Sequence, residues 1–181
     1  SFEQNDPAWV KQGTVSVQDA ISLKTTDGQK LVVFSGADGA NNGVISQSVP
    51  TIPNQKYRLQ FDMGIYASSS KTQSVQLTVR DDVGGAAGQV LLSPPAASLN
   101  LVNTTGIPVT NWQILSYEFT AISASTTIRY ADASTETASV DLLLDDVRLE
   151  AVTNSAPVAA NDGAIGAPFL AVAAGSVASA P

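Results

Sequence analysis

The chain has 181 residues, 44% of them hydrophobic, which is enough for one domain with a sizeable core. Its formal net charge of −7 would repel a nucleic-acid backbone or an anionic membrane surface. The absence of cysteine and histidine excludes disulfides, thiol nucleophiles, Ser-His-Asp triads and histidine-ligated zinc.

Short strands joined by turns are predicted along most of the chain, and no run of about 18 apolar residues indicates membrane insertion. Period-two alternation and turn signals such as "TTDGQK" and "NTTGIP" recur throughout. Nine segments are predicted to be strands: 14–17, 30–34, 43–49, 56–67, 74–81, 89–92, 112–120, 126–132 and 140–150.

The loop "SGADGANNG", residues 35–43, lacks the lysine of a phosphate-binding loop and the closing glutamate of an EF-hand, so a plain hairpin loop is expected. The segment "PAASLNLVN", residues 95–103, indicates at most a helical turn. Trp9 and Trp112 are expected to pack in the core. Five acidic residues lie in turn-like stretches, so solvated loops are favoured over a glycosidase carboxylate pair: Asp81, Asp82, Asp132, Glu136 and Asp141.

The strand predicted at 56–67 has one apolar face, from Tyr57 to Ile65, and one mostly polar face, from Arg58 to Tyr66. The next strand, 74–81, repeats this alternation. Tyr66 is the aromatic side chain on the polar side, with these polar neighbours on the two strands: Arg58, Gln60, Asp62, Gln76, Thr78 and Arg80.

The last predicted strand, "VDLLLDDVRLE", carries adjacent carboxylates at Asp145 and Asp146 among leucines. Strict alternation places Asp145 with Leu143 and Val147 on one face, and Asp146 on the other. Whichever face is buried, one aspartate must lie among apolar neighbours, which requires a partner or a metal ion. The alternative is that Asp145 pairs with Arg148 or Arg129, or lies at a solvated sheet edge.

Composition changes after residue 151. Residues 152–181 are nearly uncharged and rich in Ala, Pro, Gly and Ser, which is typical of a linker or tail. The stretch around Phe169 and Val172 is more apolar than most linkers. It could add as a strand to the open sheet edge of a neighbouring molecule, or fold back over its own domain.

Four motifs occur in a characteristic order: "SFE" followed by Trp9, "GVISQSV", "PNQKYRLQFD" and "LLDDVRL". Together they resemble the galactose-binding-like jelly rolls of bacterial secreted proteins, which include carbohydrate-binding modules and related exported cell-surface domains. The resemblance covers residues 1–151 and implies an all-β, two-sheet antiparallel jelly-roll sandwich with an extended C-terminal tail. It also implies a secreted protein at the bacterial cell surface.

The resemblance further implies a structural Ca²⁺ ion that ties the N-terminal segment to the last strand. Carried over residue by residue, its ligands are Glu3 and Asp145, with Asp146 as the alternative, Asp27 as a further candidate and carbonyls near "TTDGQK". Calcium takes oxygen ligands of this kind.

The polar face around Tyr66 would be the ligand-carrying face of such a module. The leading hypothesis is therefore a non-catalytic extracellular module that binds polysaccharide or a cell-surface glycan through these residues: Tyr66, Arg58, Gln60, Asp62, Gln76 and Arg80. The alternative is a structural subunit of a filament, surface layer or matrix that self-associates through residues 156–181. An enzyme is disfavoured because no arrangement of carboxylates singles out an acid and a base.

Overall fold

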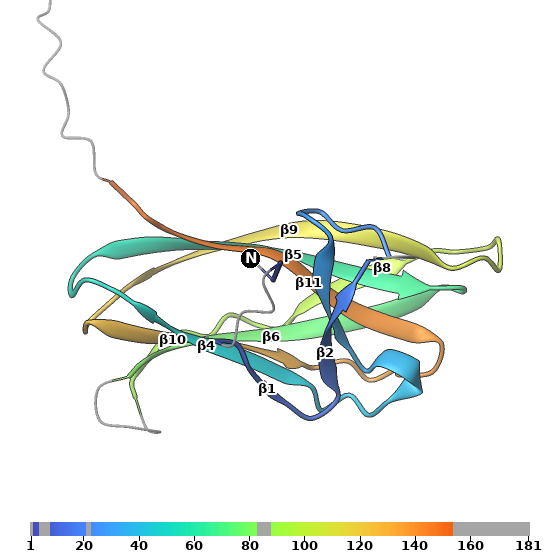
Figure 1. Ribbon diagram of the computed structural model, residues 1–181, viewed down its shortest axis with the longest axis horizontal. Coiled ribbons are helices and arrows are strands. Elements are labelled where there is room, and N and C mark those ends of the chain that lie inside the picture. Colours follow the sequence, from blue (N-terminus) through green and yellow to red (C-terminus); the bar gives the residue numbers. More distant parts are fainter. Residues whose placement is uncertain (1, 4–7, 21–22, 83–87, 154–181) are drawn as a thin grey trace, which may run out of the picture.

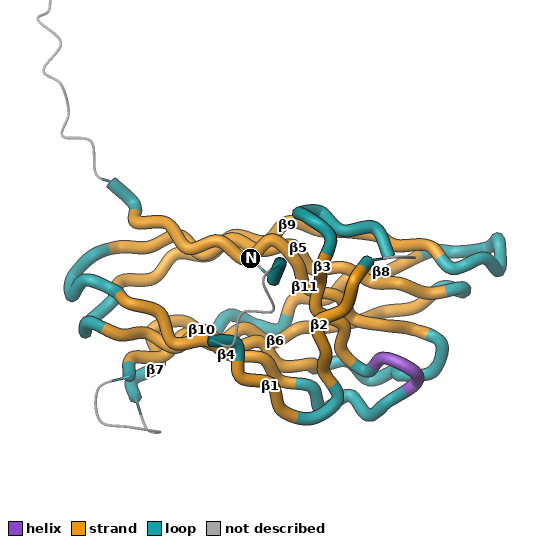
Figure 2. The backbone as a smooth tube through the Cα atoms, in the orientation of Figure 1, coloured by secondary structure: helices purple, strands orange, loops and turns teal. Residues whose placement is uncertain are grey.

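The computed structural model describes residues 2–3, 8–20, 23–82 and 88–153. In these ranges the chain forms eleven β-strands and one short 3-10 turn, η1 (Gly36–Asp38). The strands stack in two antiparallel sheets, with η1 at one end of the sandwich (Figures 1 and 2). The expected fold class, an all-β jelly-roll sandwich, is confirmed.

Sheet A contains six strands in the order β1-β4-β10-β6-β7, with β8 paired to β6. Their bounds are β1 (Val10–Gln12), β4 (Val44–Pro50), β10 (Ser125–Asp132), β6 (Lys71–Asp81), β7 (Val90–Leu92) and β8 (Ala97–Leu101).

Sheet B contains five strands in the order β2-β3-β11-β5-β9. Their bounds are β2 (Val15–Asp19), β3 (Lys30–Phe34), β11 (Val140–Ala151), β5 (Lys56–Ala67) and β9 (Val109–Thr120).

All nine predicted strands are present, and two were missed. Strand β1 is only three residues long, too short for its alternation to be recognised. Residues 97–101 form β8, so the expected helical turn at 95–103 is wrong. This segment alternates, with Leu99 and Leu101 buried in the core, and its pairing with β6 favours the extended backbone. The loop at 35–43 joins a strand of sheet B to one of sheet A, so it does not close a hairpin within one sheet.

The core lies between the two sheets. The odd-numbered residues of β5 from Leu59 to Ile65 are fully buried there, as their alternation predicts. Phe2 and Trp9 close one side of this core, with ring centroids 5.2 Å apart, and Trp9 continues to Tyr130 at 6.5 Å. Burial of Phe2 fixes the position of its neighbour Glu3 on the sandwich.

A β-bulge in β11 changes which side chains point inward. Opposite β5 the register moves three residues on β11, from Asp145 to Arg148, for two on β5, and Asp146 adopts a left-handed backbone with φ 49°. Leu144 before the bulge and Val147 after it therefore both pack on the core. The strict alternation expected from the sequence is wrong after Asp145, because the extra residue brings Val147 to the core side instead of the outer side. Asp145 itself stays on the outer side of sheet B with Leu143, as alternation predicts.

No helix in the described part of the chain is long and apolar enough to cross a membrane.

Candidate functional site

The predicted ligand residues lie on opposite sides of the sandwich. Strands β5 and β6 belong to different sheets, and the apolar faces of both strands meet in the same core. Their polar faces must therefore point in opposite directions. Four of the six predicted residues extend outward from sheet B and two from sheet A; the first set is Arg58, Gln60, Asp62 and Tyr66, and the second is Gln76 and Arg80.

The outer face of sheet B carries a second apolar cluster. Leu31, Val33 and Leu143 are buried there, and Tyr66 and Trp112 pack against them while remaining partly exposed. This cluster exists because β3 and β11 carry apolar residues on both faces. It gives sheet B two neighbouring aromatic side chains on a surface that is otherwise rich in polar residues.

Trp112 lies over Gly64, its cross-strand neighbour on β5. A Cβ atom at position 64 would come within 2.6 Å of the indole ring, so the glycine leaves the room that the ring occupies. The indole N–H donates a 2.8 Å hydrogen bond to the carbonyl oxygen of Lys24, which holds the ring orientation. The ring is thus a fixed aromatic surface beside Tyr66.

The expectation that Trp112 packs in the main core is wrong, whereas Trp9 does lie there. The alternation itself contained the signal that could have placed Trp112. Leu115, Tyr117 and Phe119 of β9 face the core, so the even-numbered residues of that strand face outward.

Three hollows follow one another across the end of sheet B that lies next to η1. The first, about 480 Å³, lies between β2 and η1. The second, about 280 Å³, lies between η1, β11 and β5 and shares Ala37 and Asp141 with the first. The third, about 200 Å³, shares Tyr66 and Pro108 with the second and also contacts Lys24. We call this row of hollows the sheet B groove.

Two carboxylates lie at the centre of the groove. Burial, and then the negative charge of Asp38, raise the pKa of Asp141 to about 6. The Asp38 carboxylate accepts a hydrogen bond from the backbone N–H of Ser139. Ala37 and Asp38 both adopt left-handed backbone conformations, with φ 58°, so the turn that carries Asp38 is held in an uncommon shape. Tyr66 is the cross-strand partner of Asp141.

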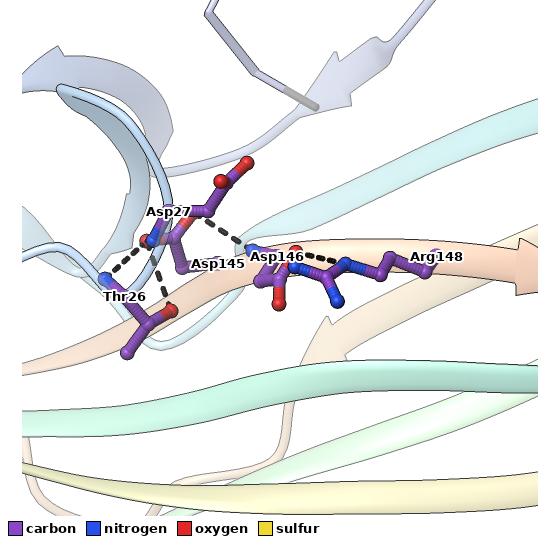
Figure 3. A network of polar contacts seen from close by, with 5 residues as sticks. All are labelled: Thr26, Asp27, Asp145, Asp146 and Arg148. Atoms are coloured by element: carbon purple, nitrogen blue, oxygen red, sulfur yellow. Dashed lines mark hydrogen bonds and ion pairs between the residues drawn. The ribbon is translucent and has the colours of Figure 1, made fainter.

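The predicted metal ligand Asp145 is buried, with 2% of its surface exposed. Its Oδ2 accepts hydrogen bonds from the backbone N–H groups of Thr26 (2.8 Å) and Asp27 (3.1 Å) and from the Thr26 hydroxyl (3.2 Å). Its Oδ1 accepts one from the N–H of Asp146 at 2.8 Å. Figure 3 shows this network between β11 and the loop that precedes β3. Four donors therefore compensate the buried charge.

Glu3 accepts hydrogen bonds from the same loop, at residues that follow Thr26 and Asp27 in the sequence. Its Oε1 accepts hydrogen bonds from the N–H groups of Gln29 (2.9 Å) and Lys30 (2.8 Å). A Cβ atom on Gly28, whose φ is 62°, would collide with the Glu3 carboxylate, so this position requires glycine. Residues 25–30, which we call the clamp loop, thus connect the N-terminal Glu3 to Asp145 on the last strand.

The other two predicted metal ligands are placed differently. Asp146 forms an ion pair with Arg148 at 2.6 Å, and the carboxylate of Asp27 points away from that of Asp145 (Figure 3). No group of three acidic side chains within the described ranges is arranged to hold a metal ion. A calcium ion at this place would therefore need the carboxylates of Glu3 and Asp145 together with carbonyl oxygens of the clamp loop.

Asp62 is the cross-strand neighbour of Asp145, and its Oδ1 is buried without a hydrogen-bond partner in the described part of the structure. Burial is the main cause that raises the pKa of Asp62, and the charges of Asp146 and Asp145 add to it. Sequence reasoning placed Asp62 among ligand-binding residues, whereas its side chain lies at the clamp.

The remaining residues of the predicted sites are distributed as follows. Arg58 forms an ion pair with Glu118 at 3.0 Å, and Gln60 lies opposite Arg148. Along β5, Asp62 at the clamp separates both residues from Tyr66 at the groove. On sheet A, Gln76 donates to the carbonyl of Pro94 at 2.8 Å. Phe169 and Val172 lie outside the described residues.

Comparisons with known proteins identify the fold alone. No family model matches the sequence, and no curated protein matches it. The K1 cleaved adhesin domain of Lys-gingipain from Porphyromonas gingivalis W83 is a solved structure with a TM-score of 0.61 and 12% identity, covering 82% of this chain and 93% of that one.

Carbohydrate-binding modules are also among the similar structures. The CBM22-1 xylan-binding domain of Paenibacillus barcinonensis Xyn10C has a TM-score of 0.51 and 15% identity, covering 82% of this chain and 88% of that one. The CBM22-1-CBM22-2 tandem domain of the same protein has a TM-score of 0.54 and 17% identity, covering 85% of this chain and 45% of that one. The chain therefore has the jelly-roll fold that these modules have, as its sequence motifs implied.

Proposed function

We propose that this protein is a non-catalytic module that binds polysaccharide in the sheet B groove. The observation that carries the proposal is the pairing of a groove with two partly exposed aromatic rings, Tyr66 and Trp112, on one outer sheet face. Sugar rings stack on such surfaces through their apolar faces, while polar groups around them fix orientation. The xylan-binding domain and the adhesin domain with the same fold support this assignment.

The residues of the sheet B groove favour a binding role over a catalytic one. Its two carboxylates are Asp38 of η1 and Asp141 of β11, and the charge of Asp38 opposes ionisation of Asp141. The chain has no histidine or cysteine to act as an alternative base or nucleophile. We propose that the module acts outside the bacterial cell, where polysaccharides are available. Its acidic, cysteine-free composition is compatible with that location.

Affinity electrophoresis against a panel of neutral, acidic and amino-sugar polysaccharides tests the proposal. We expect at least one polysaccharide to retard the protein, and Tyr66→Ala to weaken that binding roughly tenfold through loss of the stacked ring. Arg80→Ala is the matched control, because it removes a large side chain from the outer face of sheet A. The proposal fails if the folded protein is not retarded by any polysaccharide, or if Arg80→Ala weakens binding while Tyr66→Ala does not.

We further propose that Glu3 and Asp145 hold a structural Ca²⁺ ion together with carbonyl oxygens of the clamp loop. The convergence of both carboxylates on residues 25–30 supports it. Asp145 Oδ1 accepts one hydrogen bond, which leaves room for a cation at a carboxylate oxygen. When bound, calcium would supply positive charge between these carboxylates and strengthen the link between the chain's first residues and its last strand.

A second candidate function, assembly into a filament or surface layer, is favoured by β9. This twelve-residue strand lies at the edge of sheet B and, among the described residues, pairs only with β5. Its other edge therefore presents backbone N–H and C=O groups to which a further strand could bind. The apolar stretch around Phe169 from a neighbouring molecule would be that strand.

A further inference from the structure

The chemistry of the sheet B groove indicates which class of glycan it would take, an inference that rests on the proposed binding function. The hollows and the Tyr66 ring mark the site, and the charges around them set its selectivity. Asp141 is shared by the first two hollows, so a ligand that extends from one to the other must pass its carboxylate. Asp38 adds a second carboxylate to the wall of the second hollow.

These two charges are not neutralised by the groove itself. Of the described residues that line the first two hollows, Asp38 and Asp141 are the charged ones, and the rest are neutral. Lys24 lines the third hollow, which lies on the other side of Tyr66 from the first two. With a pKa of about 6, Asp141 is mostly ionised at neutral pH. The middle of the groove therefore holds a half-buried carboxylate, Asp141, and an exposed one, Asp38, with no cationic side chain among the described residues that line it.

A ligand cation would relieve this repulsion, whereas a ligand anion would increase it. An ammonium group has three hydrogen-bond donors and no acceptor, which suits two acceptor-only carboxylates. On an amino sugar, that group is attached directly to a ring whose apolar face can stack on Tyr66. The net charge of −7 would also attract a cationic polymer to the protein.

We propose that the sheet B groove selects polysaccharides with free amino groups, such as polymers of glucosamine, over neutral and uronic-acid polymers. Asp141 and Asp38 are the specificity-determining residues, and Tyr66 supplies the stacking surface common to all ligands.

Isothermal titration calorimetry of the full chain near neutral pH and at low salt tests this selectivity. The two probes are a glucosamine hexamer and an N-acetylglucosamine hexamer, which share one sugar backbone; the first has a protonatable amine where the second has a neutral acetamido group. We expect the glucosamine hexamer to bind roughly fivefold tighter, the effect of ion pairing at a partly exposed site. Asp141→Asn and Asp38→Asn should each reduce that preference. Neither variant should lower the affinity for the N-acetylglucosamine hexamer by a similar factor.

Glu150→Gln is the matched control. It changes the net charge by the same amount and lies on the same strand as Asp141, exposed at the opposite end of β11. It should leave the preference unchanged, which separates a local effect from the general charge of the protein. Thermal melts check that each variant is folded, and Asp38→Asn retains an oxygen that can accept the Ser139 N–H.

Four outcomes would overturn the inference. If the N-acetylglucosamine hexamer binds as tightly as the glucosamine hexamer, or if neither aspartate variant changes their ratio, the carboxylates do not select the ligand. If neither hexamer binds but a polymer without amino groups does, the selectivity is wrong while the binding function stands. If no polysaccharide binds at all, both proposals fail together.

Discussion

Asp145 is a buried carboxylate whose charge is balanced by four hydrogen-bond donors, three of them from Thr26 and Asp27 of the clamp loop. Asp145→Ala would leave these donors unsatisfied. We expect it to lower the free energy of unfolding by roughly 2–3 kcal/mol, measured by urea denaturation.

Asp27→Ala is the natural comparison for that variant. Asp27 contributes its backbone N–H to Asp145, which alanine retains, while its carboxylate points elsewhere (Figure 3). Its expected cost is within about 0.5 kcal/mol. If Asp27→Ala were as costly as Asp145→Ala in calcium-containing buffer, the Asp27 carboxylate would have a role that the hydrogen-bond network does not explain.

The raised pKa of Asp141 predicts how the stability of the protein changes with pH. Its pKa is raised from the ordinary value of 3.8 to about 6 in the folded chain, so the native state binds this proton more tightly than the unfolded state does. The contribution of Asp141 to stability is therefore favourable at low pH and is lost as the pH rises through about 6. Asp141→Asn should make the protein more stable than wild type near pH 7, with the difference shrinking toward pH 4.

Urea denaturation of both proteins across this pH range measures the difference directly, because the other titrating groups are common to both. Glu150→Gln, whose side chain is exposed, is the control for a general reduction of negative charge. An Asp141→Asn curve that runs parallel to wild type at every pH would show that the burial of this carboxylate has no effect on stability.

At the residue scale, alternation in the sequence predicted most inward-facing side chains, including Leu59 and Phe61. It could not predict the partners of Asp145, because Thr26 is 119 residues away along the chain. Nor could it predict the left-handed backbone of Asp146. A glycine at this position would have indicated such a backbone, whereas aspartate tolerates it without any signal in the sequence. The sequence did raise the right question, since a charged pair among leucines required compensation.

At the scale of elements, the clamp loop is the structure that joins the two ends of the domain. Its N–H groups bind Glu3 at Gln29 and Lys30, and Asp145 at Thr26 and Asp27. If calcium also binds here, it stabilises the folded state alone and its removal must lower the melting temperature.

We therefore expect EDTA to lower the melting temperature by at least about 5 °C relative to millimolar calcium. Glu3→Gln should melt at the same temperature in both buffers. An unchanged melting temperature for the wild type would show that hydrogen bonds alone hold the clamp loop. The hydrogen bonds from the clamp loop to Glu3 and Asp145 could hold the loop without a metal ion, so the melting temperature distinguishes the two explanations.

The main failure of sequence reasoning at this scale was the assignment of strands to sheets. Alternation in the consecutive strands 56–67 and 74–81 predicts one polar face around Tyr66 to which both strands contribute. The short connection after Ala67 instead crosses from sheet B to sheet A, so Tyr66 and Arg80 face opposite sides. Alternation defines the two faces of a strand, and it contains no information about which sheet the strand joins.

At the scale of the whole molecule, the sandwich leaves the long edge of β9 available for another strand. The twelve residues of this strand include a single charged side chain, Glu118, so little in it opposes strand addition. The proposed filament function requires the segment around Phe169 and Val172 to supply that strand from a neighbouring molecule.

Deletion of residues 156–181 tests this assembly. We expect the full-length chain to form concentration-dependent oligomers and the truncated chain to be monomeric, measured by light scattering coupled to gel filtration. Full-length Phe169→Asp is the matched variant, because it keeps the length of the tail while placing a charge where a pocket would need an apolar ring. Equal masses for all three proteins over a wide concentration range would eliminate assembly through this segment. The first two hollows of the groove, which contain Asp38 and Asp141, are lined by residues outside β9, so glycan binding there by the truncated chain should remain intact in either case.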